Sequence, residues 1–254
     1  MVLDSQNYYQ NDELKIYRGQ DFVISKHIKI HQPTLGEICD YGEESYYLMI
    51  HRFVSTPQDL KAQLWKMGID YTTISPFEIF CKILCKLYSE SDTAILFGDL
   101  DFLKFKFFVK KDNSFLLQQQ IGNDLVSIDE YTYNMIVDYI CKTYFIKRDL
   151  RIPANNSTKM ALIEDAIMEQ NLNKTKEFHS QLKDLISAAI NSTGFKYNHS
   201  QVWDMPINAF MDSIMRIKKI KNADLLLQSG YSGFGINLDK IEKKQLDWLG
   251  ELTM

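Results

Sequence analysis

Two carboxylates, Asp99 and Asp101, are the side chains of this sequence best suited to chemistry. They lie two positions apart in AILFGDLDFLKFK. On a strand, that spacing puts both on one face, where they could hold Mg²⁺ for phosphoryl or nucleotidyl transfer, with Lys104 or Lys106 steadying a phosphate. The third carboxylate that such a site needs is not evident, and acids are common in turns before strands. We therefore favour a turn and keep a Mg²⁺-dependent nucleic-acid enzyme as the minor alternative.

The cysteines and histidines do not form a clearer candidate metal site. Cys81 and Cys85 lie one helical turn apart in FEIFCKILCKLY, but no His or Cys pair is spaced to complete a zinc site. His27 and His31 would share one strand face, too far apart to bind one metal without other ligands. We expect buried thiols, solvated or hydrogen-bonded histidines, no metal and no cofactor. No catalytic constellation is recognisable among these residues, and a small-molecule ligand is not expected.

The stretch Val202–Gly235 contains the densest set of residues that start or end helices and form turns. Asp204 and Pro206 are typical of a helix start. Apolar residues then repeat at helical spacing on one face, namely Ile207, Phe210, Met211, Ile214 and Ile217. The basic run 216–221 suits the C-terminal end of a helix, and Asn222 could start another. A solvated helix end explains this basic run better than a nucleic-acid site.

A glycine-rich stretch follows at Gly230–Gly235, with Tyr231 and Phe234 between the glycines. It lacks the Lys-Ser/Thr ending of a phosphate-binding P-loop, and no clear strand precedes it. We predict that it ends the helix as a turn with two aromatic anchors.

Periodicity assigns the elements that would position these residues. Two strands are expected at 14–18 and 27–32. After a series of helices, a hairpin of two further strands is expected at 103–109 and 115–119. Helix starts are expected at Thr34–Glu37, Ser75–Glu78 and Ser127–Glu130, where the spacing of a capping box recurs. After Pro153 every pattern is helical, including a last amphipathic helix over 238–249.

The predicted fold class is therefore α+β. A mixed N-terminal region with short antiparallel strands and helices precedes an all-helical C-terminal region. The charged linker KRDLRIP sets the expected division: a flexible N-terminus at 1–12, an α+β domain at 13–150 and a helical domain at 151–254.

Composition limits the function. The chain has 254 residues, 45% hydrophobic and 24% charged, with a net charge of −4, so no global basic field favours nucleic acid or acidic lipid. Its start lacks the pattern of a secretory signal, and no apolar run has the length of a membrane span. Four cysteines are too few for a disulfide framework. These features predict a cytoplasmic protein without a membrane partner.

Five segments together resemble an uncharacterised family from tail-gene modules of phages and prophages of Gram-positive bacteria. They are IYRGQDF, IKIHQPTLGEICDYGEESYY, LWKMGIDYTTI, KRDLRIPANNSTKMALIEDA and VWDMPINAFMDSIMRIKKIKNADLLLQSGYSGFG. Family members resemble tail assembly chaperones or other tail-module proteins in gene context and in their helical C-terminal halves. The resemblance implies a non-enzymatic protein of the host cytoplasm that binds phage tail structural proteins, such as tape measure, baseplate or hub. The alternative is a structural component of the virion, at the neck or baseplate.

The expected partner-binding surface follows from the helix around Ile214. Met215 lies at the flank of the apolar stripe and Ile220 lies outside it. Methionine suits adaptable surfaces, and Tyr231 and Phe234 adjoin on the glycine-rich stretch. We therefore predict that a tail-protein segment docks across Met215, Ile220, Tyr231 and Phe234.

Overall fold

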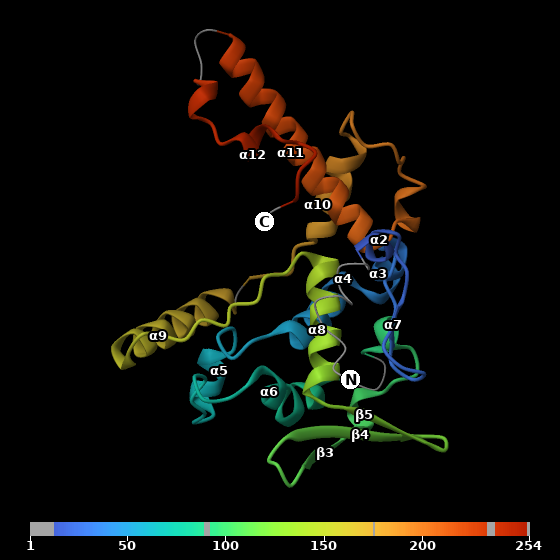
Figure 1. The fold of residues 1–254 in the computed structure, drawn as a ribbon, viewed down its shortest axis with the longest axis vertical. Coiled ribbons are helices and arrows are strands. Elements are labelled where there is room, and N and C mark those ends of the chain that lie inside the picture. The colour runs from blue at the N-terminus through green and yellow to red at the C-terminus, as the bar shows by residue number, and fades with distance from the viewer. Residues whose placement is uncertain (1–12, 89–91, 175, 233–236, 253–254) are drawn as a thin grey trace. The chain divides into compact units, whose positions relative to one another are not determined.

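A computed structural model of the chain describes residues 13–88, 92–174, 176–232 and 237–252 (Figure 1). The described residues form two compact units: unit 1 lies within 13–19, 33–37 and 180–252, and unit 2 within 20–32 and 38–179. The expected flexible segment 1–12 lies outside the described residues. The expected division between 150 and 151 stays a prediction.

Unit 2 combines helices with two small antiparallel sheets, which confirms the predicted α+β class. Its helices are α4 (Glu43–Val54), α5 (Lys61–Lys66), α6 (Pro76–Lys82), α7 (Ala94–Phe97), α8 (Glu130–Tyr144) and α9 (Asn156–Asn173), with 3₁₀ turns η1 (Leu84–Leu87) and η2 (Phe102–Lys104). Strands β1 (Phe22–Val23) and β2 (Lys29–Ile30) form one sheet, and β3 (Lys106–Val109), β4 (Phe115–Ile121) and β5 (Asp124–Ile128) form the other. Helix α3 (Leu35–Tyr41) begins in unit 1 and ends in unit 2.

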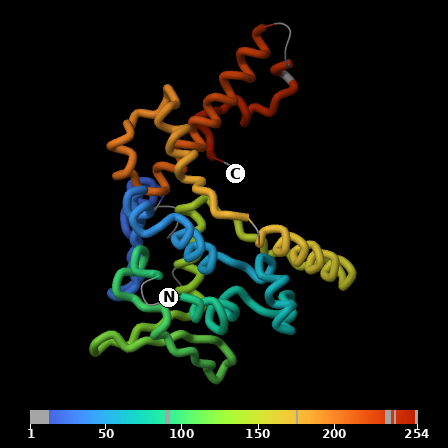
Figure 2. The backbone as a smooth tube through the Cα atoms, turned by 180° about the vertical axis from the view of Figure 1, so that it is seen from behind, coloured from blue at the N-terminus to red at the C-terminus, as the bar shows by residue number. Residues whose placement is uncertain are grey.

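The core of unit 2 lies between the three-stranded sheet and its helices. Helix α6 packs on β4 and α8 on β5, so both cover the same face, and α4 packs on α8 (Figures 1 and 2). Leu117 pairs with Ile128 in the ladder, and both point inward with no exposed surface. Behind them lies a cluster of buried aromatic rings, which includes Phe53, Phe80 and Tyr133.

Unit 1 brings together segments from three parts of the chain. Its elements are α2 (Glu13–Tyr17), α10 (Gln181–Ile190), η3 (Val202–Asp204), α11 (Ile207–Tyr231), η4 (Leu238–Lys240) and α12 (Lys243–Leu246). The backbone N–H of Leu35 donates to the Met205 carbonyl at 3.0 Å, and that of Ile207 donates to the Pro33 carbonyl at 3.0 Å. This pairing anchors residues 33–37 beside the start of α11.

Several of the predicted elements differ from the structure. Residues 14–18 were expected to form a strand but lie largely in helix α2, because a five-residue apolar pattern does not distinguish the two periods. Helix α11 runs unbroken past Asn222 to Tyr231, so the run 216–221 lies inside a helix and not at its end. The last helix, expected over 238–249, consists only of the short elements η4 and α12.

Candidate partner-binding surface

The candidate surface is the C-terminal hairpin of unit 1, which we define as α11 from residue 211 to 231 together with residues 237–252. In this hairpin, the chain after α11 returns beside the helix (Figures 1 and 2). We call 237–252 the C-terminal segment. It contains only two short helical elements, so many of its backbone carbonyls need partners outside regular structure.

Basic side chains of α11 hold the C-terminal segment. Arg216 Nη1 donates to the carbonyl oxygens of Trp248 at 2.6 Å and Gly250 at 2.9 Å. Lys219 Nζ donates to the carbonyl of Glu251 at 2.7 Å. Hydrogen bonds from charged donors are shorter and stronger than neutral ones. The middle of α11 therefore holds the C-terminal segment through its backbone carbonyls, so these contacts do not depend on which side chains the segment carries.

A close contact at Gly230 positions the other end of the segment. A Cβ atom added to Gly230 would lie 2.3 Å from Leu238 Cγ. The glycine therefore lets the returning chain approach the helix directly. The expected turn at this glycine is wrong, because Gly230 belongs to α11, while Gly233 and Gly235 lie outside the described residues.

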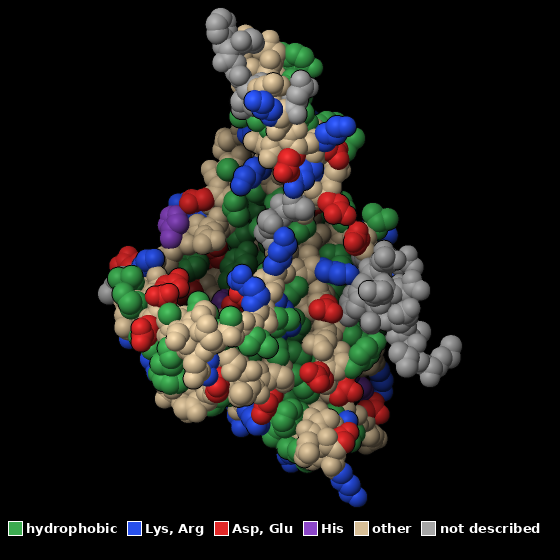
Figure 3. All heavy atoms as spheres, turned by 60° about the vertical axis from the view of Figure 1, so that its left-hand side comes forward, with side chains coloured by type: hydrophobic (Ala, Val, Ile, Leu, Met, Phe, Trp, Pro, Cys, Tyr) green, Lys and Arg blue, Asp and Glu red, His purple; other side chains and the backbone are tan. Residues whose placement is uncertain are grey.

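The hairpin covers most of its large apolar side chains only in part. Among the described residues of the hairpin, Ala223 alone is buried. Seven apolar side chains of α11 are half-buried: Met211, Ile214, Met215, Ile217, Ile220, Leu226 and Leu227. Four more apolar residues are exposed, namely Leu225, Tyr231, Trp248 and Leu249. Over α11 and the C-terminal segment, Lys and Arg side chains lie among hydrophobic ones (Figure 3).

The structure places three of the four predicted docking residues on α11. Met215 and Ile220 are half-buried and Tyr231 is 81% exposed, whereas Phe234 lies outside the described residues. At about 100° per residue, Ile220 and Tyr231 share one side of the helix, about 16 Å apart along its axis. Met215 lies about 140° from Ile220 around the helix. The structure therefore brings Ile220 and Tyr231 to one side and places Met215 on another.

The C-terminal segment runs between these two sides. Arg216, Lys219 and Ala223 mark the side of α11 that faces it, and the helical wheel places this side between Met215 and Ile220. Sequence reasoning missed Arg216 and Lys219 as contact residues. Their i, i+3 spacing was visible, but nothing in the sequence showed which groups they would meet.

The two carboxylates of the predicted pair, Asp99 and Asp101, lie in different surroundings. Asp101 is 7% exposed and caps η2 by accepting from the Leu103 N–H at 2.9 Å, and it pairs with Lys104 at 3.0 Å. Asp99 is exposed, and both acids lie in a turn before η2, which agrees with the favoured turn and not with a shared strand face. Among the described residues, no three His, Cys, Asp or Glu side chains are grouped as a metal site would require.

The thiols and imidazoles occupy structural positions. Cys81 and Cys85 are buried, and burial raises the pKa of Cys85 to about 11. His27 Nε2 lies 2.7 Å from Asp124 and His31 Nδ1 lies 2.7 Å from Asp21, as expected of hydrogen-bonded histidines.

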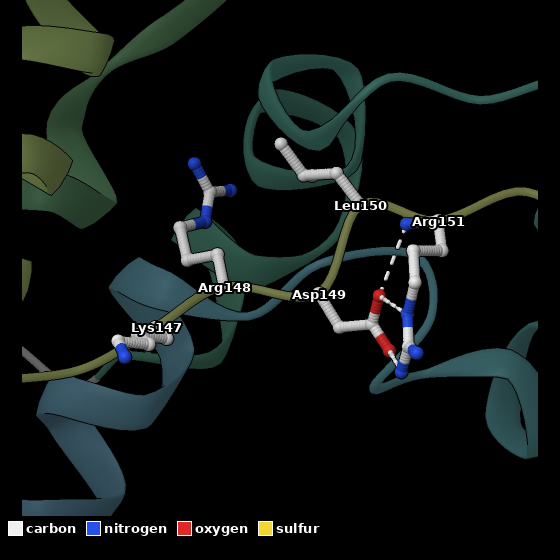
Figure 4. A pocket seen from close by; sticks show the side chains of 5 residues that line it. All are labelled: Lys147, Arg148, Asp149, Leu150 and Arg151. Carbon is white, nitrogen blue, oxygen red and sulfur yellow. Dashed lines mark hydrogen bonds and ion pairs between the residues drawn. The ribbon is translucent and has the colours of Figure 1, made fainter. Parts of the chain in front are cut away.

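A shallow depression of about 420 Å³ lies along Lys147–Arg151 in unit 2 (Figure 4). Arg148 and Arg151 point to different sides of the loop. Arg148 Nε donates to the Val54 carbonyl at 2.9 Å, and Arg151 forms a two-pronged pair with Asp149 at 2.9 and 2.7 Å. The basic groups do not converge on one point, so this depression is not built to hold an anion.

Part of this chain is similar to a phage-related family. The matching family model is described as the YomV second domain and covers residues 173–253, which include α10, α11 and the C-terminal segment; YomV is a Bacillus phage or prophage protein. No curated protein and no solved structure matches the chain. No helix among the described residues has both the length and the hydropathy to cross a membrane.

Proposed function

We propose that this chain is a phage tail assembly protein, a non-enzymatic chaperone that binds tail structural proteins during morphogenesis. One observation carries the proposal: Ala223 is the one buried residue among the described residues of the C-terminal hairpin, while its other large apolar side chains keep exposed surface. Contiguous exposed apolar surface marks protein-interaction sites. The similarity to a phage-related family covers this same hairpin and supports the proposal.

The partner would contact the hairpin on both sides of the C-terminal segment. Ile220, Leu227 and Tyr231 line one side at spacings of seven and four residues, so an apolar segment of a tail protein fits along them. Met215 supplies a second contact on the opposite flank, where its flexible side chain suits more than one partner sequence. Phe234 completes the predicted set.

Replacing Met215 and Ile220 together by Asp tests the surface. Both residues are half-buried, so the double variant should keep its fold, while charges placed in an apolar interface weaken partner retention by about tenfold or more. The matched control carries Asp at Leu225 and Gln228, exposed positions on the side of α11 away from the segment. The measurement is co-purification of tail proteins from phage-producing cells, with circular dichroism to verify folding.

Two outcomes would count against this surface. An unfolded double variant would show that Met215 and Ile220 belong to the core of unit 1. A folded double variant that retains every tail protein as well as the Leu225 and Gln228 control would place the docking site elsewhere.

Mass spectrometry of purified virions distinguishes a chaperone from a virion component. A chaperone acts in the host cytoplasm and leaves before the particle is complete, so its peptides should be absent from mature particles. Stoichiometric peptides in the virion would instead establish a structural component of the neck or baseplate.

A further inference from the structure

Helix α9 of unit 2 exposes an acidic face. Its other side packs on α5, where Ile163 is 1% exposed and Lys66 Nζ donates to Gln170 Oε1 at 3.2 Å. The outward side carries Glu164, Asp165 and Glu169, all exposed, around Met168, which is 64% exposed. No Lys or Arg occurs from residue 160 to 173, so no cation along this stretch offsets these carboxylates.

Helix α11 of unit 1 exposes a basic face of similar pattern. Lys218 and Lys221 are exposed, and one turn further Leu225 is 65% exposed. On the helical wheel these three residues lie opposite the side that holds the C-terminal segment. No Asp or Glu occurs from residue 213 to 223, and the exposed Asp224 lies about 60° from Lys221 around the helix, at the edge of this face. On the face itself, two lysines accompany a large exposed apolar side chain.

We propose that α9 of one copy of this chain docks on the Lys218, Lys221 and Leu225 face of α11 in a second copy. The occupant is a second copy because the chain itself carries the complementary face: carboxylates around Met168 match lysines beside Leu225. Opposite charges at the rim steer the encounter and set the register, and the two apolar side chains exclude water between them.

The geometry of this contact determines the kind of assembly. The two faces differ, so each copy retains one unused acidic face and one unused basic face after pairing. Such heterologous contacts produce rings or open chains, in contrast to two-fold dimers. Two helix faces form a small interface, so the association is reversible and depends on concentration. This self-association is separate from the binding of tail proteins.

Sedimentation velocity of the full chain over a wide concentration range tests the proposal. The average mass should rise above the monomer mass of 29.7 kDa with concentration, and salt should reverse the increase by screening. The double variants K218E/K221E and E164K/E169K should each weaken association by about tenfold or more. The chain that carries all four substitutions should recover it, because the charges are then exchanged between the faces.

The control is K240E/K243E, which makes the same change of net charge at two exposed lysines of the C-terminal segment and should associate as the wild type does. A wild type that stays monomeric at every concentration overturns the proposal. It is equally overturned if K218E/K221E associates like the control, or if the folded four-substitution chain stays monomeric.

Discussion

Arg216 offers the sharpest test of how the C-terminal hairpin is held together. Its guanidinium donates to two backbone carbonyls of the C-terminal segment, at 2.6 and 2.9 Å. Substitution R216M keeps a long apolar side chain and removes both bonds. We expect the segment to detach locally while the remainder of unit 1 stays folded.

The magnitude follows from the exposure of the contact. A hydrogen bond with a charged partner stabilises by about 1.5–3 kcal/mol in a buried setting. Trp248 is 46% exposed and Arg216 is only half-buried, so solvent screening lowers each bond to about 0.5–1 kcal/mol. Losing both bonds therefore costs about 1–2 kcal/mol, which raises the open population of the segment by about 5–30-fold.

Amide hydrogen exchange of the C-terminal segment measures this opening, because exchange reports the free energy of local unfolding. In R216M, peptides from 237–252 should exchange about 5–30 times faster than in the wild type. The matched control is K218M, which removes one positive charge from an exposed side chain two residues away. It should leave exchange of the segment unchanged.

Three results would contradict this reasoning. Equal exchange in R216M and the wild type would mean that the two hydrogen bonds contribute nothing. Equal acceleration in K218M would replace a specific contact by a general charge effect. Faster exchange around Phe210, which is fully buried, would show that Arg216 supports the core of unit 1 as well.

Two further predictions concern unit 2. Asp129 caps α8 by accepting from the Thr132 N–H at 2.9 Å, so D129A should lower the free energy of unfolding by about 1 kcal/mol in denaturant titration, whereas S127A should be nearly neutral. The hydrogen bond from Lys159 lowers the pKa of Asp70 from 3.8 to about 2, and because the folded pKa is depressed, its stabilisation is present above pH 4 and is lost as the pH falls toward 2. The wild type should lose stability across that window more steeply than D70N, and parallel curves would show that the pair does not stabilise the fold.

Local sequence signals predicted those helix starts that use side-chain hydrogen bonds within one turn. The expected capping box at Thr34 is confirmed: its N–H donates to Glu37 Oε2 at 2.8 Å, and its Oγ1 accepts from the Glu37 N–H at 3.2 Å. Ser75 likewise accepts from the Glu78 N–H at 3.1 Å. These contacts span three residues, so the sequence contains both partners.

The box expected at Ser127 is wrong because two overlapping patterns compete there. Ser127 lies in β5, where it pairs with Gln118 of β4, and the chain stays extended until Asp129. The pairing of Ser127 with strand β4 therefore leaves Asp129, and not Ser127, to cap helix α8. The spacing of Ser127 and Glu130 contains no information about β4.

The candidate surface depends even more on distant contacts. Because cations suit the C-terminal end of a helix, the sequence predicts a helix end at the basic run 216–221. The structure instead divides the run between two sides of a continuous helix: Arg216 and Lys219 hold the returning chain, while Lys218 and Lys221 remain exposed. Predicting that division requires knowing the path of residues 237–252. This segment contains little regular structure, and its sequence has no periodic pattern.

The division of basic residues between two sides of α11 is consistent with the two proposed contacts of this helix, one with a tail protein and one with a second copy of the chain. The C-terminal segment covers a single side of α11, and its grip relies on backbone carbonyls, so it leaves the flanking apolar side chains only half-buried. A helix sealed by an apolar partner helix would have buried Ile220 and Met215 completely. A helix without any cover would expose an apolar surface too extensive for a monomer. Under the two proposals above, this partial cover would keep the flanks available for a tail protein and the lysine face available for a second copy.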